Sequence, residues 1–242
     1  MKIISRLATF ILLAVSLIAG QAAFAQTHVS AAITWPGNKA QFFLSDGTYV
    51  RYDVKADTAD EGYPKPVNNK TWPGMGAYAK QIAAAVRGGD ANKAFFFLSD
   101  GSYLRYDVKE DRVDEGYPKP ITDKTWPGMG KYATKIYCAI NWPGDKVQFF
   151  LNDGTYIRYD LKNDSVDEGY PKAITNSTWP GLAQYASKLA GAINWNGSKA
   201  YFFLDDGRYL RYDIKEDGVD EGYPKTIDDK TWPGLHGYFR RR

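Results

Sequence analysis

The sequence has few of the residues that build disulfides and metal centres. Its 242 residues include one cysteine and two histidines. Because Cys138 has no partner, a disulfide within the chain is excluded. The two histidines, His28 and His236, also lack the close spacing of a hydrolytic zinc motif. The net charge is only +3, from 31 basic and 28 acidic residues, so the chain lacks the basic excess of a nucleic-acid-binding protein.

Long apolar runs are scarce as well. The only one is Leu7 to Ala19, which follows Lys2 and Arg6 and precedes Ala23-Phe24-Ala25. A largely apolar run of 13 residues is too short to span a bilayer, and the small-x-small triplet is typical of a cleavage site. We therefore expect residues 1–25 to be a secretory signal peptide and the mature protein to be secreted or periplasmic, without a membrane span. An uncleaved interfacial anchor is the alternative.

The chain is rich in aromatic residues and in internal repetition. Arg-Tyr-Asp recurs with its tyrosine at Tyr52, Tyr106, Tyr159 and Tyr212, at spacings of 54, 53 and 53 residues. Trp-Pro-Gly recurs with the same spacings from Trp72. Concordant repeats of this length indicate four copies of one structural unit.

Each unit predicts short antiparallel strands. In the first unit, residues 30–35, 39–45 and 48–54 form apolar runs separated by turn residues, and Asp46-Gly47 is a strong hairpin signal. A weaker outer strand is expected near each Asp-Glu-Gly-Tyr-Pro stretch. Since Phe42-Phe43-Leu44 and its counterparts place bulky groups on both strand faces, both faces of each sheet must be covered. The sequence therefore predicts an all-β, four-bladed propeller; an open solenoid is the alternative.

Small residues begin each unit, as expected where four inner strands converge on one axis. The pairs are Ala31-Ala32, Ala84-Ala85, Cys138-Ala139 and Gly191-Ala192. In this setting Cys138 is expected to be a small buried hydrophobe; a reactive or metal-binding thiol is the alternative.

In this order, Val29 to Trp35, the Phe-Phe-Leu hairpin, Tyr-x-Arg-Tyr-Asp, Asp-Glu-Gly-Tyr-Pro-Lys and Trp-Pro-Gly resemble the hemopexin-like repeat. The resemblance covers residues 29–242 and implies four-stranded antiparallel blades with short helical connections. We expect residues 26–28 to be a short N-terminal segment and the blades to span about 29–81, 82–135, 136–188 and 189–242. The resemblance to the hemopexin-like repeat also implies recognition of a ligand rather than catalysis.

The resemblance further implies ions in the central tunnel, held by backbone groups. The matching positions are Ser30, Ala32, Ala83, Ala85, Tyr137, Ala139, Ala190 and Ala192. Calcium or sodium, with chloride, are the expected ions. Two features depart from the family pattern: no acidic residue begins the inner strands, which makes a divalent ion doubtful, and the disulfide that joins the first and last blades is missing. Ring closure must then come from packing, with the segment Leu235 to Arg242 beside Val29.

Ligand-binding residues are sought where the repeats differ. The second unit carries Arg87-Gly88-Gly89 and one extra residue where the others keep Trp35, Trp142 and Trp195. Arg87 is therefore a candidate ligand contact, with neutral drift of a surface loop as the alternative. His28 and His236 are further candidates, because heme carriage needs axial ligands such as histidine.

These observations favour a non-enzymatic binding protein for an extracellular or periplasmic protein or glycan, monomeric or weakly associating. Heme or metal scavenging is the alternative. A hydrolase that uses the acidic loop residues, such as Asp57, Asp60 and Glu61, is a more distant one, since fourfold repetition does not suit a single active site.

Overall fold

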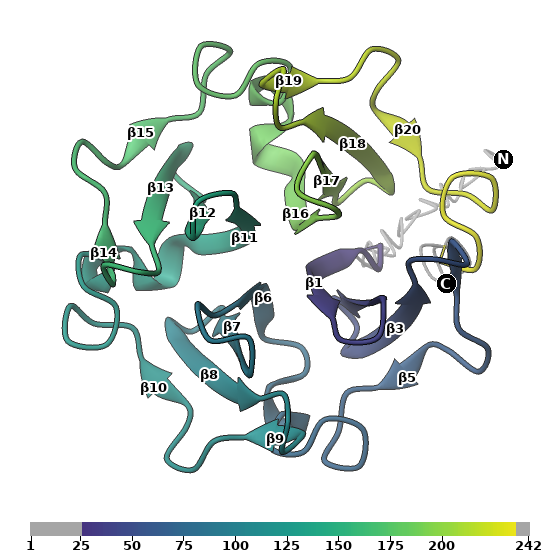
Figure 1. The fold of residues 1–242 in the computed structure, drawn as a ribbon, viewed down its shortest axis with the longest axis vertical. Coiled ribbons are helices and arrows are strands. Elements are labelled where there is room, and N and C mark those ends of the chain that lie inside the picture. Colours follow the sequence, from purple (N-terminus) through teal and green to yellow (C-terminus); the bar gives the residue numbers. More distant parts are fainter. Residues whose placement is uncertain (1–25, 236–242) are drawn as a thin grey trace, which may run out of the picture.

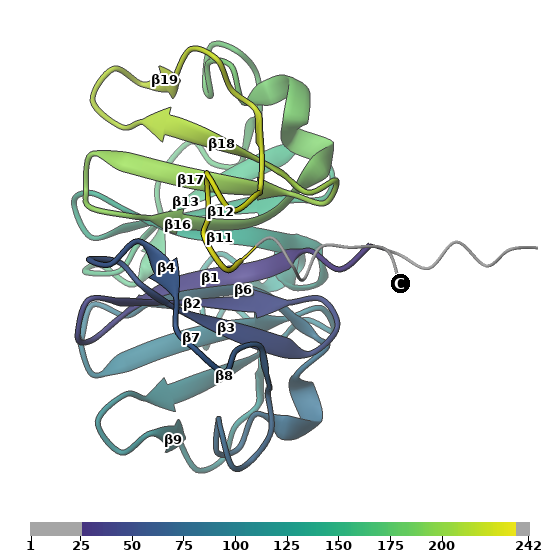
Figure 2. The same ribbon diagram turned by 90° about the vertical axis from the view of Figure 1, so that its right-hand side faces the viewer.

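The computed structural model describes residues 26–235, which form four antiparallel sheets around a common axis (Figure 1). Seen from the side, the sheets form a disc (Figure 2). The first strand of each sheet lies at the centre, and neighbouring first strands contact one another around the ring. The prediction of a four-bladed propeller is thus confirmed, and the open solenoid was wrong. The expected signal segment 1–25 lies outside the described residues.

Every blade has the same strand order, from the axis outward. Blade one has β1 (Val29–Trp35), β2 (Lys39–Leu44), β3 (Thr48–Asp53), β4 (Thr58–Ala59) and β5 (Lys65–Pro66). Blade two has β6 (Ile82–Arg87), β7 (Lys93–Leu98), β8 (Ser102–Asp107), β9 (Arg112–Val113) and β10 (Lys119–Pro120). Blade three has β11 (Ile136–Trp142), β12 (Lys146–Leu151), β13 (Thr155–Asp160), β14 (Ser165–Val166) and β15 (Lys172–Ala173). Blade four has β16 (Leu189–Asn194), β17 (Lys199–Leu204), β18 (Arg208–Asp213), β19 (Gly218–Val219) and β20 (Lys225–Thr226).

The expected outer strand is split into two short pieces, both paired with the third strand. In blade one these pieces are β4 and β5, and the cis bond between Tyr63 and Pro64 lies between them. Proline also removes a backbone donor, which suits an edge position. Short 3-10 helices connect the blades, as expected: η1 (Gly76–Tyr78), η2 (Gly130–Lys135) and η3 (Ala183–Lys188).

The core is divided among the four interfaces between blades. Side chains of a strand alternate between its two neighbours, so Phe42 packs toward blade four and Phe43 toward blade two. Both are fully buried. The tryptophan of each Trp-Pro-Gly motif lies in one interface: Trp72, Trp126, Trp179 and Trp232.

The Trp-Pro-Gly motif also links each blade to the next through the backbone. The carbonyl of Pro73 accepts a hydrogen bond from the Val113 amide of blade two, at 2.9 Å. Gly74 has φ +89°, and a Cβ there would lie 2.7 Å from Val113 Cβ. Only glycine combines this backbone conformation with this close approach. The motif is therefore a joint between blades.

The same joint closes the ring. Pro233 accepts a hydrogen bond from the Ala59 amide at 2.9 Å, which connects blade four to blade one. Beside the axis, a Cβ on Gly191 would lie 3.0 Å from the carbonyl oxygen of Val29, so the first and last inner strands touch. Leu235 is fully buried in the cluster that contains Val29, as expected, while residues 236–242 lie outside the described part. Packing and backbone hydrogen bonds therefore close the ring without a disulfide.

Candidate ligand-binding site

The centre of the ring holds a narrow cavity of about 20 Å³, room for roughly one water molecule. Three of the predicted tunnel positions, Ala32, Ala85 and Ala192, lie in its wall. Ala139, the fourth equivalent, is buried in the interface between blades two and three. The structure therefore brings three of these four alanines to one axial cavity.

The other predicted tunnel positions are Ser30, Ala83, Tyr137 and Ala190. Each is the extra residue at an irregularity where the register of an inner strand shifts. The side chains of two of them turn back to the protein. Ser30 Oγ donates to the Phe43 carbonyl at 3.3 Å, and the Tyr137 hydroxyl donates to the Ala186 carbonyl at 2.6 Å. None of the four lines the described cavity.

Side-chain amides occupy one mouth of the tunnel. Asn141 accepts a hydrogen bond from the Arg87 amide at 2.8 Å and donates to the Arg87 carbonyl at 2.9 Å. Asn194 donates to the Asn141 carbonyl at 3.2 Å. These contacts satisfy backbone groups of Arg87 and Asn141 beside the axial cavity, which both asparagines line. This mouth is therefore a poor fit for a backbone-held ion, and our sequence analysis missed both asparagines.

The Arg87 side chain lies away from the axis. Its guanidinium carbon stands 5.4 Å above the Trp35 ring, between blades one and two, and Nη2 donates to the Ala91 carbonyl. Nη1 is buried without a hydrogen-bond partner, and burial lowers the pKa of the group. Arg87 thus covers an indole of the first interface.

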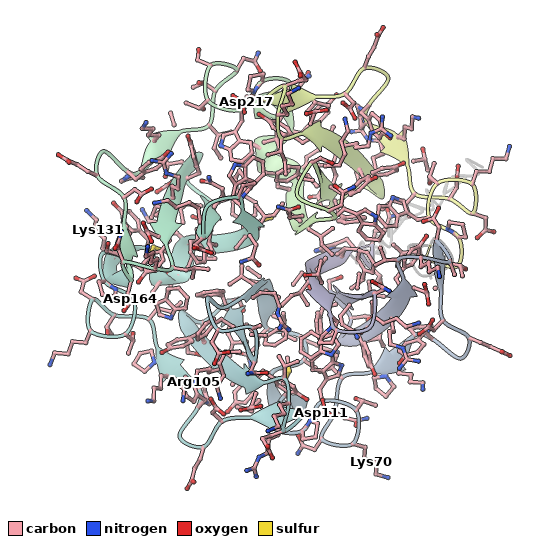
Figure 3. The ribbon with its side chains drawn as sticks, in the orientation of Figure 1. Lys70, Arg105, Asp111, Lys131, Asp164 and Asp217 are labelled. Carbon is pink, nitrogen blue, oxygen red and sulfur yellow. The ribbon has the colours of Figure 1, made fainter. Side chains whose placement is uncertain are left out.

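A pocket of about 570 Å³ opens between blades two and three. Blade two contributes aromatic rings and charged groups to its lining, and blade three contributes charged groups and a leucine. The lining residues are Gly88, Gly89, Asp90, Lys93, Phe95, Tyr103, Arg105, Tyr117, Thr125, Trp126, Asp145, Leu161, Lys162 and Asp164. Figure 3 labels Arg105 of blade two and Asp164 of blade three, which belong to its two sides.

The pocket lies where a tryptophan is missing. In the other interfaces, Trp35, Trp142 and Trp195 pack edge-on against Trp72, Trp179 and Trp232, with ring centroids 5.1, 5.2 and 5.4 Å apart. Blade two has Gly88 at this position, and Gly88 lies in the pocket wall. The loop with the extra residue holds its shape through the Gly88 amide, which donates to the Lys93 carbonyl at 2.9 Å.

Hydrogen bonds fix the charged groups of the pocket rim. Lys93 donates to Asp107 at 2.8 Å and to Asp114 at 2.9 Å, hydrogen bonds that raise its pKa. The Asp164 carboxylate accepts the Tyr159 hydroxyl at 2.7 Å. Because its walls are hydrogen-bonded within the protein, the pocket is preformed.

The remaining predicted site residues do not join this pocket. His28 precedes β1, where its Nδ1 lies 3.1 Å from the Gln26 carbonyl. His236 lies outside the described residues. Cys138 is fully buried, which raises the pKa of its thiol. Within residues 26–235, no group of three His, Cys, Asp or Glu side chains is arranged to hold a metal ion.

The repeated carboxylates have structural partners in every blade. In blade one, Lys39 bridges Asp53 at 2.8 Å and Asp60 at 2.9 Å, and Arg51 also pairs with Asp60. Asp57 accepts the Tyr52 hydroxyl at 2.9 Å. The hydrogen bond from Lys39 lowers the pKa of Asp53 to about 2. For Asp60, burial favours the neutral form, but the Lys39 and Arg51 hydrogen bonds outweigh it and lower its pKa.

Comparisons with known proteins agree with this architecture. Residues 82–131 match the family model described as Hemopexin. The macrophage metalloelastase of Oryctolagus cuniculus is 29% identical over 201 residues, which cover 83% of this chain and 38% of the relative. The chain thus spans less than half the length of that curated relative. Among the described residues, no helix is long and apolar enough to cross a membrane.

Solved structures show the same fold at low sequence identity. The hemopexin fold protein CP4 from cow pea is 20% identical with a TM-score of 0.72, over 87% of this chain and 98% of that one. A plant lectin with two metal binding sites, from Cicer arietinum, is 21% identical with a TM-score of 0.68, over 88% and 99% of the two chains. With its four repeated blades, this chain has the hemopexin fold, and its second repeat matches the Hemopexin family model.

Proposed function

We propose that the chain is an exported, non-enzymatic binding module that recognises an extracellular or periplasmic protein or glycan in the pocket between blades two and three. The observation that carries this proposal is the absence, from one of the four repeated interfaces, of a tryptophan that the other three contain. Three interfaces place an indole at a position that blade two leaves to Gly88. Aromatic walls with a few fixed polar groups are typical of ligand pockets.

The repeated carboxylates near the pocket do not favour a catalytic role. Asp164 in the pocket rim is engaged by Tyr159, and its equivalents Asp111 and Asp217 accept the corresponding tyrosines at 2.9 and 2.7 Å. A hydrolase would need two carboxylates in contrasting environments. These carboxylates repeat one environment in each blade, which supports a structural role for them.

Tunnel ions belong to the proposal as a secondary element. Calcium or sodium, with chloride, stay the ions proposed for the axis, but the cavity beside Ala32, Ala85 and Ala192 has room for about one water molecule and would hold only one of them at a time. The similarity to a lectin with two metal binding sites supports this element. Metal analysis of the purified protein before and after dialysis against chelator tests it. For heme, a Soret titration with a His28→Ala control tests the alternative that the sequence left open.

The binding proposal is tested by ligand capture and a glycan array with two matched variants. Gly88→Trp with Phe95→Gln gives blade two the tryptophan and glutamine of blade three, Trp142 and Gln148, and should fill the pocket. Lys215→Ala is the control, because Lys215 is the exposed equivalent of Lys162 in blade four. We expect the ligand to be lost by the double variant and kept by the control. Equal binding by both would overturn the proposed site.

If the double variant loses its fold, circular dichroism will show it, and Lys162→Glu takes its place. That substitution reverses one rim charge without entering the core. If both variants bind the captured ligand as well as the wild-type protein does, the ligand binds elsewhere on the molecule, which contradicts the proposal.

A further inference from the structure

The repeated interfaces of this chain offer a direct comparison for the pocket between blades two and three. The interface between blades four and one contains Trp232, Tyr201 and Tyr209, which correspond to Trp126, Phe95 and Tyr103 of the pocket. Both sets are aromatic at every position. The two interfaces therefore provide an occupied and a vacant copy of one arrangement.

Ring distances agree between the two copies. Tyr201 and Phe95 each lie 5.1 Å from the interface tryptophan. The distances of Tyr209 and Tyr103 from that tryptophan are 5.6 and 5.7 Å. In the occupied copy, the Trp195 ring stands 5.4 Å from Trp232, 5.7 Å from Tyr201 and 6.0 Å from Tyr52. The receiving rings are thus arranged the same way whether or not the indole is present.

The vacant position is accessible because Gly88 has no side chain and lines an open pocket. Phe95 occupies part of the space, since a Cβ on Gly88 would lie 3.0 Å from its ring. Tyr201, its counterpart in blade four, coexists with Trp195 in the same interface. An aromatic ring at the position of Phe95 is therefore compatible with an indole in the same interface.

From this comparison we infer that the pocket binds an exposed tryptophan or tyrosine side chain of a partner polypeptide, as an aromatic anchor. The inference rests on the proposed function and specifies its ligand. Anchors of this type fill preformed pockets and carry a large share of the binding energy of an interface. The three indoles that this chain places at the same position favour an indole supplied from outside over a sugar ring.

The charges around the pocket fit an anchor better than a strongly charged ligand. The lining includes three acidic residues, Asp90, Asp145 and Asp164, and three basic ones, Lys93, Arg105 and Lys162. A rim without excess charge gives little long-range attraction to an anionic polymer. We expect the affinity for the partner to change by no more than about threefold between low and high salt.

The test uses 5-fluoroindole and N-acetyl-tryptophan amide, with N-acetyl-leucine amide as the control probe. In the full chain, saturable shifts of the Gly89 amide resonance, which the wild-type protein and the double variant both have, are expected with the aromatic probes only. Gly88→Trp with Phe95→Gln should abolish these shifts, because the chain then fills the position itself. Absence of saturable shifts in the wild-type protein, or equal shifts in the double variant, would overturn the anchor.

The captured ligand separates this inference from the proposed function. A polypeptide ligand should lose about 30-fold or more in affinity when its anchoring tryptophan or tyrosine becomes alanine. A glycan that the double variant no longer binds would overturn the anchor and keep the proposed function. A ligand still bound by the double variant, while 5-fluoroindole binds only the wild type, would overturn the proposed ligand site and keep the aromatic subsite.

Discussion

The interface between blades four and one and the interface between blades two and three share one aromatic cluster and differ in its outermost ring. Trp195 completes the first, and Gly88 leaves the second open. The inner rings keep their spacing in both, and backbone bonds such as that between Pro127 and Val166 hold the blades together regardless. The indole at the position of Trp195 is therefore not needed to hold neighbouring blades together. Its absence from blade two creates a pocket and leaves the ring of blades closed.

The largest effect should come from removing the central ring of either cluster. Trp126→Ala and Trp232→Ala each delete a buried indole, which costs about 3–5 kcal/mol. Trp232→Ala should cost about 1 kcal/mol more, because Trp195 also loses its aromatic partner. Urea unfolding of both variants measures the difference. The reverse order would show that the two interfaces do not differ as described.

Converting the occupied interface into the vacant one should have the next largest effect. Trp195→Gly removes a partly buried indole and should cost about 2 kcal/mol. It should also create a second site for 5-fluoroindole, and saturating probe should restore part of the lost melting temperature. Lys215→Ala, in the same blade but outside the cluster, should change neither property. Failure of the probe to rescue the variant would break the equivalence of the interfaces.

Filling the vacant interface should produce a smaller change of opposite sign. Gly88→Trp with Phe95→Gln should stabilise the fold by about 1 kcal/mol, as cavity-filling substitutions do. Gly88→Trp alone should gain less, because its Cβ meets the Phe95 ring at 3.0 Å. Thermal melting of both variants checks this order, and a greater gain from the single substitution would contradict it.

Acid should not distinguish the two interfaces at all. Hydrogen bonds from Lys93 and Lys199 lower the pKa of Asp107 and Asp213 to about 2, below the ordinary value of 3.8. Because the folded-state pKa is lowered, each carboxylate stabilises the fold fully above about pH 4 and loses this effect as the pH falls toward 2.

Hydrogen exchange at pH 5 and pH 2.5 measures the acid response of each blade. Lys93→Met and Lys199→Met should weaken it equally in blades two and four. An acid-induced loss of protection confined to one blade would show that the two clusters are not equivalent.

The repeat spacing and the strand patterns predicted the propeller, because each blade repeats the same period and the same turns. The closed ring could also be predicted from the sequence, because the small residue Gly191 and the repeated Trp-Pro-Gly motif mark positions where neighbouring blades approach closely. The hydrogen bonds to backbone groups near the axis could not be predicted, because the repeat spacing does not show that Asn141 contacts the Arg87 backbone of another blade.

The pocket was only partly predictable. The sequence of the second unit differs from the other three, and it predicts Arg87 as the ligand contact, whereas the pocket results from the tryptophan that this unit lacks. In the structure Arg87 covers Trp35 on one side of blade two, and the neighbouring Gly88 opens the pocket on the other. Alternation along a strand explains this separation. A site made by a missing ring has no residue of its own to reveal it.

The carbonyl of each Trp-Pro-Gly proline reaches the following blade in the same way, from Pro73 to Pro233. No contact of this kind marks one boundary between blades as the seam. These hydrogen bonds therefore do not depend on which blade comes first in the chain. A circular permutant that starts at blade two and finishes with blade one would keep every one of these links.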